Sequence, residues 1–138
     1  MSLKVKLSSD SKLERSTEKA AGLDLSSTKR VSLHPGDIVS VPTGVACQFP
    51  KGTYGRIAGR SSLASKSGLI VAGGVIDPDY TGYIEVILLN LGKATYEIQI
   101  GDRIAQLIVE CFCFTDIQIV ENLPETKRGT SGFGSTGK

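Results

Sequence analysis

Residues 31–57 read VSLHPGDIVSVPTGVACQFPKGTYGRI, and their pattern decides the fold class. Polar and apolar residues alternate in short runs, which are separated by turn-forming residues at 34–37, 42–44 and 50–52. Successive side chains of a β-strand point to opposite faces, so each run is typical of a strand with one buried face. Pro and Gly at the separators favour tight turns. The stretch therefore predicts four short strands in close succession.

Similar runs continue on both sides of this stretch, at 3–7, 83–89, 96–100, 104–114 and 117–119. Only residues 61–67 indicate a helix, and it would be short. Many short strands at regular spacing are typical of a β-barrel or jelly roll. We therefore predict an all-β fold, a distorted jelly-roll barrel with at most one short helix, over residues 1–125.

The last thirteen residues, 126–138, read TKRGTSGFGSTGK and differ in kind from the rest. Gly, Ser and Thr dominate, and Phe133 is the single large apolar residue. Such a segment cannot bury enough apolar surface to pack alone, which predicts a flexible tail. Its glycines, hydroxyls and Arg128 also suit a lid that binds phosphate. Composition leaves both interpretations open.

The overall composition excludes several classes of function. The 138 residues contain 16 Lys and Arg against 14 Asp and Glu, for a net charge of +2, so we expect no nucleic-acid partner. No apolar run approaches the roughly 18 residues of a membrane span, and we expect no membrane partner. The amino terminus lacks the continuous apolar stretch of a signal peptide, which suggests an intracellular protein, cytoplasmic or nuclear.

Cysteine and histidine are scarce. Three cysteines in a chain without a secretory signal argue against a disulfide framework. Cys111 and Cys113 would share one face of a strand, where we expect both to be buried. His34, the sole histidine, lies in a turn, so a zinc site and a histidine base are both disfavoured. Catalysis would depend on carboxylates, hydroxyls, arginine or a metal brought by a substrate.

Four further segments place small or polar residues where an all-β domain would place strand formers. AAGLDL (20–25) sets a carboxylate among apolar residues, and GRSSLA (59–64) sets Arg60 beside two hydroxyls at the start of the predicted helix. GGVIDPDYTG (73–82) contains Asp77, and GDRIAQL (101–107) contains Gln106. Taken singly, each has an ordinary structural explanation, such as a serine helix cap or an Asp-Pro turn.

Taken together and in order, AAGLDL, GRSSLA, GGVIDPDYTGYIEV, GDRIAQL and RGTSGFGSTG resemble the five motifs of the homotrimeric dUTP diphosphatases, over about residues 4–137. The resemblance implies jelly-roll subunits that form a homotrimer, with each active site built from several subunits. It implies that dUTP is hydrolysed to dUMP and diphosphate by water attack on the α-phosphorus, with Mg²⁺ as cofactor. That activity limits uracil incorporation into DNA and supplies dUMP for thymidylate synthesis.

The resemblance also implies roles for individual residues. Asp77 corresponds to the carboxylate that orients and deprotonates the attacking water. Gln106 helps hold that water near the α-phosphate, and Asp24 supports Mg²⁺ through water. The residues implied in phosphate binding are Arg60, Ser61, Ser62, Gln106, Arg128, Gly134, Ser135 and Thr136. The residues implied in binding uracil and deoxyribose are Gly74, Asp77, Tyr80, the backbone of Glu85, and Phe133, which stacks on the base. The tail, 126–138, would close over an active site of the trimer.

Three residues depart from the usual motifs: Ser62 and Glu85 stand where glycine is frequent, and Thr81 where arginine is frequent. Two alternatives share the fold. A dCTP deaminase would need an arginine and a glutamate where Ser65 and Ile87 stand, so it would lack its acid and base. The second alternative is a non-catalytic nucleotide-sensing or partner-binding protein, since a fold does not fix a function.

Overall fold

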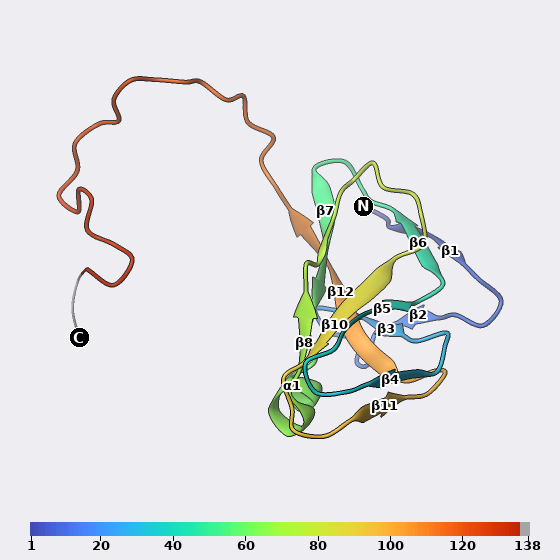
Figure 1. Cartoon of the computed structure of the whole chain (residues 1–138). Helices are drawn as coiled ribbons and strands as arrows, with labels where there is room; N and C mark the ends of the chain where they lie inside the picture. The colour runs from blue at the N-terminus through green and yellow to red at the C-terminus, as the bar shows by residue number, and fades with distance from the viewer. Residues whose placement is uncertain (136–138) are drawn as a thin grey trace.

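Short β-strands make up most of the regular structure. The computed structural model describes residues 1–135, and in this part of the chain twelve strands accompany one helix (Figure 1). The elements are β1 (Lys4–Leu7), β2 (Leu13–Glu14), β3 (Leu23–Ser26), β4 (Val31–Leu33), β5 (Ile38–Pro42), β6 (Val45–Gln48), β7 (Thr53–Ala58), α1 (Ser61–Ser67), β8 (Leu69–Ala72), β9 (Val75–Ile76), β10 (Glu85–Asn90), β11 (Tyr96–Ile98) and β12 (Arg103–Cys111). The predicted all-β fold with one short helix at 61–67 is confirmed.

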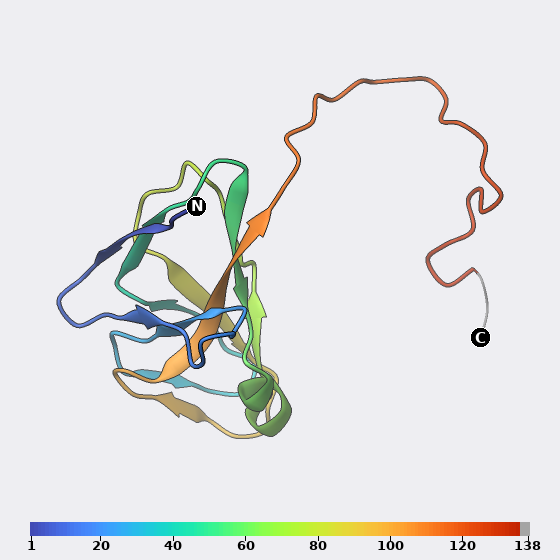
Figure 2. The same cartoon turned by 180° about the vertical axis from the view of Figure 1, so that it is seen from behind.

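The strands pair antiparallel in four groups. The largest has the order β2-β3-β12-β7-β9, so that β12 joins strands from distant parts of the chain. A second group has the order β5-β10-β8, and β1-β6 and β11-β4 form two further pairs. These groups wrap around a common interior, as in a jelly roll, and α1 lies at one end beside β8 (Figures 1 and 2).

The interior follows from the alternation seen in the sequence. In β10, Val86 and Leu88 point inward and are buried, whereas Glu85 and Ile87 point outward. Every strand group contributes to the same apolar core, whose largest fully buried members are Leu25, Leu33, Leu69, Ile84, Leu88, Ile98, Ile104 and Leu107. Burial of such side chains is the main favourable term in folding. The core therefore fixes the strands on which the candidate site residues lie.

The strand boundaries differ from the prediction at the carboxyl end. The run predicted at 104–114 ends at Cys111, where its partner strand β7 begins with Thr53. The run at 117–119 forms no strand within residues 1–135. A strand needs a hydrogen-bonded neighbour, and alternation alone does not supply one. β2, β3, β8 and β9, in contrast, form in segments where no strand was predicted.

The cysteines correct another expectation. Cys47 is buried in β6, and burial raises the pKa of its thiol to about 11, so it stays protonated at neutral pH. Cys111 and Cys113 are exposed, and the expectation that both are buried is wrong. The reason is that β12 ends at Cys111 and the chain then leaves the core. All three thiols are free in the structure.

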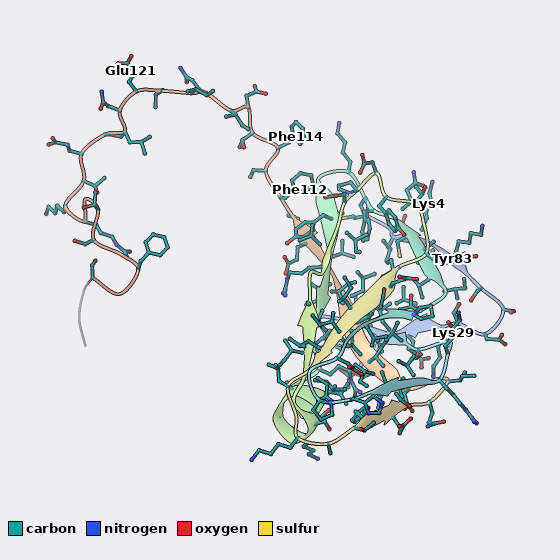
Figure 3. All side chains as sticks on the ribbon, in the orientation of Figure 1. Lys4, Lys29, Tyr83, Phe112, Phe114 and Glu121 are labelled. Carbon is teal, nitrogen blue, oxygen red and sulfur yellow. The ribbon has the colours of Figure 1, made fainter. Side chains whose placement is uncertain are left out.

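Beyond β12 the chain runs away from the barrel. Residues 112–135 contain no strand or helix, and almost all of them are exposed. Figure 3 shows Phe112 close to the barrel, and Phe114 and Glu121 progressively further out. Within residues 1–135, no helix is long and apolar enough to cross a membrane. The fold thus presents a barrel with a long carboxyl-terminal extension.

Candidate active site

Strand pairing brings three of the five motifs together. In the register of β12 with its neighbours, Gln106 lies opposite Asp24 of β3 on one side and Ala58 of β7 on the other. Gly59 and Arg60 connect β7 to α1, which begins with Ser61. These elements enclose a polar hollow of about 160 Å³, here called the Asp24 hollow, lined by Ser16, Asp24, Arg60, Ser61, Ser62, Arg103 and Gln106.

Hydrogen bonds fix the side chains of the Asp24 hollow. Gln106 Nε2 donates to the carbonyl oxygen of Gly59 at 2.9 Å, which holds the amide beside the Arg60 loop. Gly22 makes room for that amide, because a Cβ at position 22 would lie 2.3 Å from Gln106 Oε1. Arg60 Nη1 donates to the carbonyl oxygen of Arg103 at 2.8 Å. The motifs at 20–25, 59–64 and 101–107 therefore share one built surface.

Arg103 is a member of this hollow that the sequence analysis did not single out. Its Nη1 lies 3.2 Å from Asp24 Oδ2, and the Asp24 carboxylate is mostly buried, with 13% of the side chain exposed. A register shift in β12 between Arg103 and Ala105 bulges the strand, and such bulges redirect side chains. The arginine stands inside the motif GDRIAQL and lies opposite Ser26 in the β3–β12 register, but only the structure shows that its side chain reaches Asp24.

The third motif forms a separate hollow. A space of about 540 Å³, here called the Asp77 hollow, is lined by Ser40, Val75, Ile76, Asp77, Tyr80, Tyr83, Ile84, Glu85 and Ile87. Tyr80 is held across the loop, because its hydroxyl donates to the carbonyl oxygen of Tyr83 at 2.8 Å. Gly82 permits this arrangement, since a Cβ there would lie 2.5 Å from the Tyr80 hydroxyl oxygen. Asp77 and Tyr80 thus lie on one shaped surface.

Two further members of the predicted base site occupy different positions. The Glu85 side chain lines the Asp77 hollow, where Ser40 Oγ donates to Glu85 Oε2 at 2.5 Å. Ser40, which the sequence analysis did not select, comes from β5. Gly74 lines a neighbouring hollow, and its carbonyl oxygen accepts the Ile57 N–H at 2.7 Å. Its φ of 105° is in the region that favours glycine.

The tail motif lies apart from both hollows. Arg128, Phe133, Gly134 and Ser135 are on the extension that leads away from the barrel, and Thr136 lies outside the described residues (Figures 1 and 2). The segment forms successive turns, in which Arg128 Nε donates to the carbonyl oxygen of Ser131 at 2.8 Å. Phe133 is fully exposed and has a φ of 49°, a conformation uncommon for a bulky residue.

Apart from Gly74 in its neighbouring hollow, the structure therefore sorts the predicted site residues into three groups. The Asp24 hollow and the Asp77 hollow share no lining residue, and the described part of the tail lines neither. One chain in this conformation does not place Asp77 next to Gln106 or Arg60. A molecule that touched all three groups would have to bind between separate chains or after a large movement.

The carboxylates offer little to a metal ion on their own. Among residues 1–135, no three His, Cys, Asp or Glu side chains cluster in a way that could hold a metal. Asp24 supplies a single carboxylate, and Arg103 already binds one of its oxygens. This donor set does not fit a cation held by protein alone. It does fit Mg²⁺ held mainly by phosphate oxygens and water, because that ion usually retains several waters.

Comparison with known proteins identifies the family of this chain. The family model described as dUTPase matches residues 10–137, which is nearly the whole chain. The chain belongs to the dUTPase family. A deoxyuridine 5'-triphosphate nucleotidohydrolase of Paramecium bursaria Chlorella virus 1 is 49% identical over 123 residues, covering 89% of this chain and 87% of the viral protein.

Solved dUTPase structures share the fold. The dUTPase of Staphylococcus bacteriophage 80alpha, in a mutant form solved with dUpNHpp, superimposes with a TM-score of 0.91 at 28% identity and covers 99% of both chains. A mutant dUTPase from phage phi11 of S. aureus superimposes with a TM-score of 0.82 at 27% identity, covering 88% of this chain and 98% of that one. That phi11 structure is described as coordinating a structural Mg(II) ion.

Proposed function

We propose that this chain is a dUTP diphosphatase that hydrolyses dUTP to dUMP and diphosphate. The observation that carries the proposal is the Asp24 hollow, in which two guanidiniums, three hydroxyls, an amide and the Asp24 carboxylate converge in a member of the dUTPase family. Arginine and hydroxyl donors suit phosphate oxygens. We also propose that the protein is intracellular, where it would encounter dUTP.

Within this proposal, the two hollows divide the nucleotide between them. Arg60, Ser61 and Ser62 bind the phosphates, and Gln106 holds the water near the α-phosphate. Tyr80 packs against the deoxyribose, and backbone groups near Gly74 and Glu85 read the uracil edge. Hydrogen-bond reading of a base edge discriminates strongly, because a wrong base leaves buried polar groups unpaired.

Asp77 accepts the proton of the attacking water in this mechanism. The chain has no histidine near either hollow, and an ionised carboxylate can perform this step. Mg²⁺, held on the triphosphate and supported through water by Asp24, supplies charge neutralisation when bound. The remaining acceleration comes from positioning and from the cationic donors, as in other phosphoryl transfers.

A homotrimer explains why the site residues lie apart. If one chain supplies its Asp24 hollow and a second its Asp77 hollow, a substrate bound between them meets both. The tail, 126–138, would close over the site from another chain, with Arg128, Gly134, Ser135 and Thr136 at the phosphates and Phe133 over uracil. The exposed Phe133 side chain and the apolar side chains of Ile117 and Ile119 would gain burial in such an assembly.

The test is a substrate panel of dUTP, dCTP, dTTP and UTP with Mg²⁺. We expect dUMP and diphosphate in quantity from dUTP alone. A dCTP deaminase would instead release ammonia from dCTP and leave the triphosphate intact. A nucleotide-sensing protein would bind without releasing diphosphate. Either of these results would contradict the proposal.

Tyr80→Ala is expected to relax the sugar selectivity. The ring is fixed across its own loop by the hydrogen bond to the Tyr83 carbonyl, so it forms a rigid wall of the Asp77 hollow. Removing it makes room for a 2′-hydroxyl, and we expect kcat/KM for UTP relative to dUTP to rise about 10-fold or more, since one steric clash is worth roughly 1–3 kcal/mol. Tyr83→Phe serves as a matched control, because the Tyr83 carbonyl remains. An unchanged UTP to dUTP ratio in Tyr80→Ala would refute the role of the ring.

A further inference from the structure

The end of α1 that lies away from the Asp24 hollow packs tightly against the chain at Leu91 and Gly92. Gly68 follows the helix with a φ of 69°, and its carbonyl oxygen accepts the Leu91 N–H at 2.9 Å. Gly92 lies against the same turn, and a Cβ at position 92 would lie 2.4 Å from the carbonyl oxygen of Ser67. Two backbone segments therefore touch where no side chain fits between them.

A buried amide fixes the loop that α1 packs against. Asn90 is fully buried, and its Nδ2 donates to the carbonyl oxygens of Leu33 at 2.9 Å and Ala94 at 3.0 Å. Its Oδ1 accepts the N–H of Gly92 at 2.8 Å. A buried amide with all these partners is costly to disturb, because each lost bond leaves an unsatisfied polar group. The loop at 91–95 is thus a firm base for the helix.

The short helix α1 connects the loop at 91–95 to Arg60, Ser61 and Ser62. α1 has seven residues and begins at Ser61, directly after Arg60. A helix rises about 1.5 Å per residue, so α1 is short. A displacement of its last turn therefore also moves its first turn. The side chains of Ser61 and Ser62 are carried by its first turn, so their positions depend on where its last turn rests.

We propose that Asn90, Gly68 and Gly92 form a clamp, the α1 clamp, that positions Arg60, Ser61 and Ser62 for the phosphates of the substrate. These are positioning residues, because they act only through α1. The proposal rests on the proposed function of the Asp24 hollow as the phosphate site. Misplacing a binding group by about 1 Å can cost about 100-fold in rate.

The testing variant is Gly92→Ala. Its backbone φ is not positive, so the added methyl group acts mainly through its clash with the Ser67 carbonyl. We expect kcat/KM for dUTP to fall about 10- to 100-fold. Affinity for dUpNHpp should fall at least about 10-fold, whereas affinity for dUMP should change by less than about twofold, because dUMP lacks the β- and γ-phosphates. A purely structural defect would lower the active fraction for both ligands alike.

Gly36→Ala provides the matched control. Gly36 has a φ of 87° and no atom within 4 Å of an added Cβ, and its N–H donates to the Asn90 carbonyl. This variant strains the same region without pressing on α1, so its melting temperature should fall while both affinities stay at the wild-type values. If Gly36→Ala also lowers the affinity for dUpNHpp but not the affinity for dUMP, the α1 clamp is refuted.

The remaining outcomes are also decisive. If wild-type protein hydrolyses dUTP and Gly92→Ala binds dUpNHpp normally, the clamp is wrong and the proposed function stands. If wild-type protein does not hydrolyse dUTP, the proposed function fails and the clamp fails with it. Should Gly92→Ala not fold, hydrogen exchange in wild-type protein gives the answer. Coupling is reciprocal, so dUpNHpp but not dUMP must slow exchange at the Leu91 and Gly92 amides, and equal exchange would overturn the proposal.

Discussion

Asp77→Asn is expected to bind nucleotide normally and to lose turnover of dUTP. Removing a general base typically costs about 10²- to 10⁴-fold in rate, and asparagine cannot accept the proton of the attacking water. The measurement is kcat from diphosphate release, together with the affinity for dUpNHpp by calorimetry. The expected signature is a fall in kcat with the dissociation constant within about threefold of wild type.

The structure explains why this variant should fold. Asp77 follows β9 directly, and its carbonyl oxygen, which accepts the Tyr80 N–H at 3.1 Å, is unchanged by the substitution. Among the described residues, the Asp77 carboxylate accepts no hydrogen bond that the turn depends on. Asparagine keeps the size of the side chain and removes only its charge and basicity.

Asp79→Asn is the matched control for Asp77. Asp79 lies in the same turn two residues later, but it does not line the Asp77 hollow. We expect Asp79→Asn to retain a rate close to that of wild type. An equal loss of turnover in the two variants would mean that the negative charge of the turn matters, and that Asp77 is not a specific base. Wild-type turnover in Asp77→Asn would remove Asp77 from the mechanism.

The fold was predictable where alternation and turns coincide. Residues 31–57 predict four strands, and β4 to β7 occupy that stretch. The prediction failed at 117–119, where alternation is present but no neighbouring strand exists in the described chain. It also missed β3, which has only four residues and pairs with the distant strand β12. Sequence alone does not supply the partner of a strand.

The candidate site was predictable as a set of residues but not as an arrangement. The motifs identified Asp24 and Gln106, which lie 82 positions apart and become neighbours only through the β3–β12 register. The same pair of strands brings the Arg103 side chain to Asp24, although Arg103 itself lies opposite Ser26. The separation of the Asp77 hollow from the Asp24 hollow depends on how the sheets wrap, which no local pattern encodes.

Deleting residues 126–138 is expected to leave the barrel folded and to abolish most of the activity. Within residues 1–135, the tail residues 126–135 hydrogen-bond only with one another and almost all are exposed, so their removal costs the core nothing. A lid that orders over the substrate excludes water and adds contacts to the phosphates, and its loss should lower kcat/KM at least about 100-fold. Thermal unfolding should shift by no more than about 2 °C, as for surface changes generally.

Point variants separate the chemistry of the tail from its length. Arg128→Ala and Phe133→Ala should each lower kcat/KM about 10-fold or more, because each removes a proposed contact with phosphate or uracil. Lys127→Ala, one residue before Arg128, removes a charge of the same sign and should have little effect. Full activity in the truncated chain would refute the role of the tail. An equally large loss of kcat/KM in Lys127→Ala would mean that the tail acts only through its positive charge.

Mixing two inactive variants distinguishes a site shared between chains from a site within one chain. In the structure, the tail leads away from its own barrel, and none of its described residues lines the Asp77 hollow. Chains with Asp77→Asn keep an intact tail, and chains without 126–138 keep Asp77. If active sites are built from several subunits, refolding the two variants together must regenerate sites that contain both an intact Asp77 and an intact tail. Activity should then return to a sizeable fraction of wild type, whereas two variants refolded separately and then combined under conditions that prevent exchange stay inactive. Failure of the co-refolded mixture, with mixed oligomers verified by mass, would mean that each tail serves its own barrel.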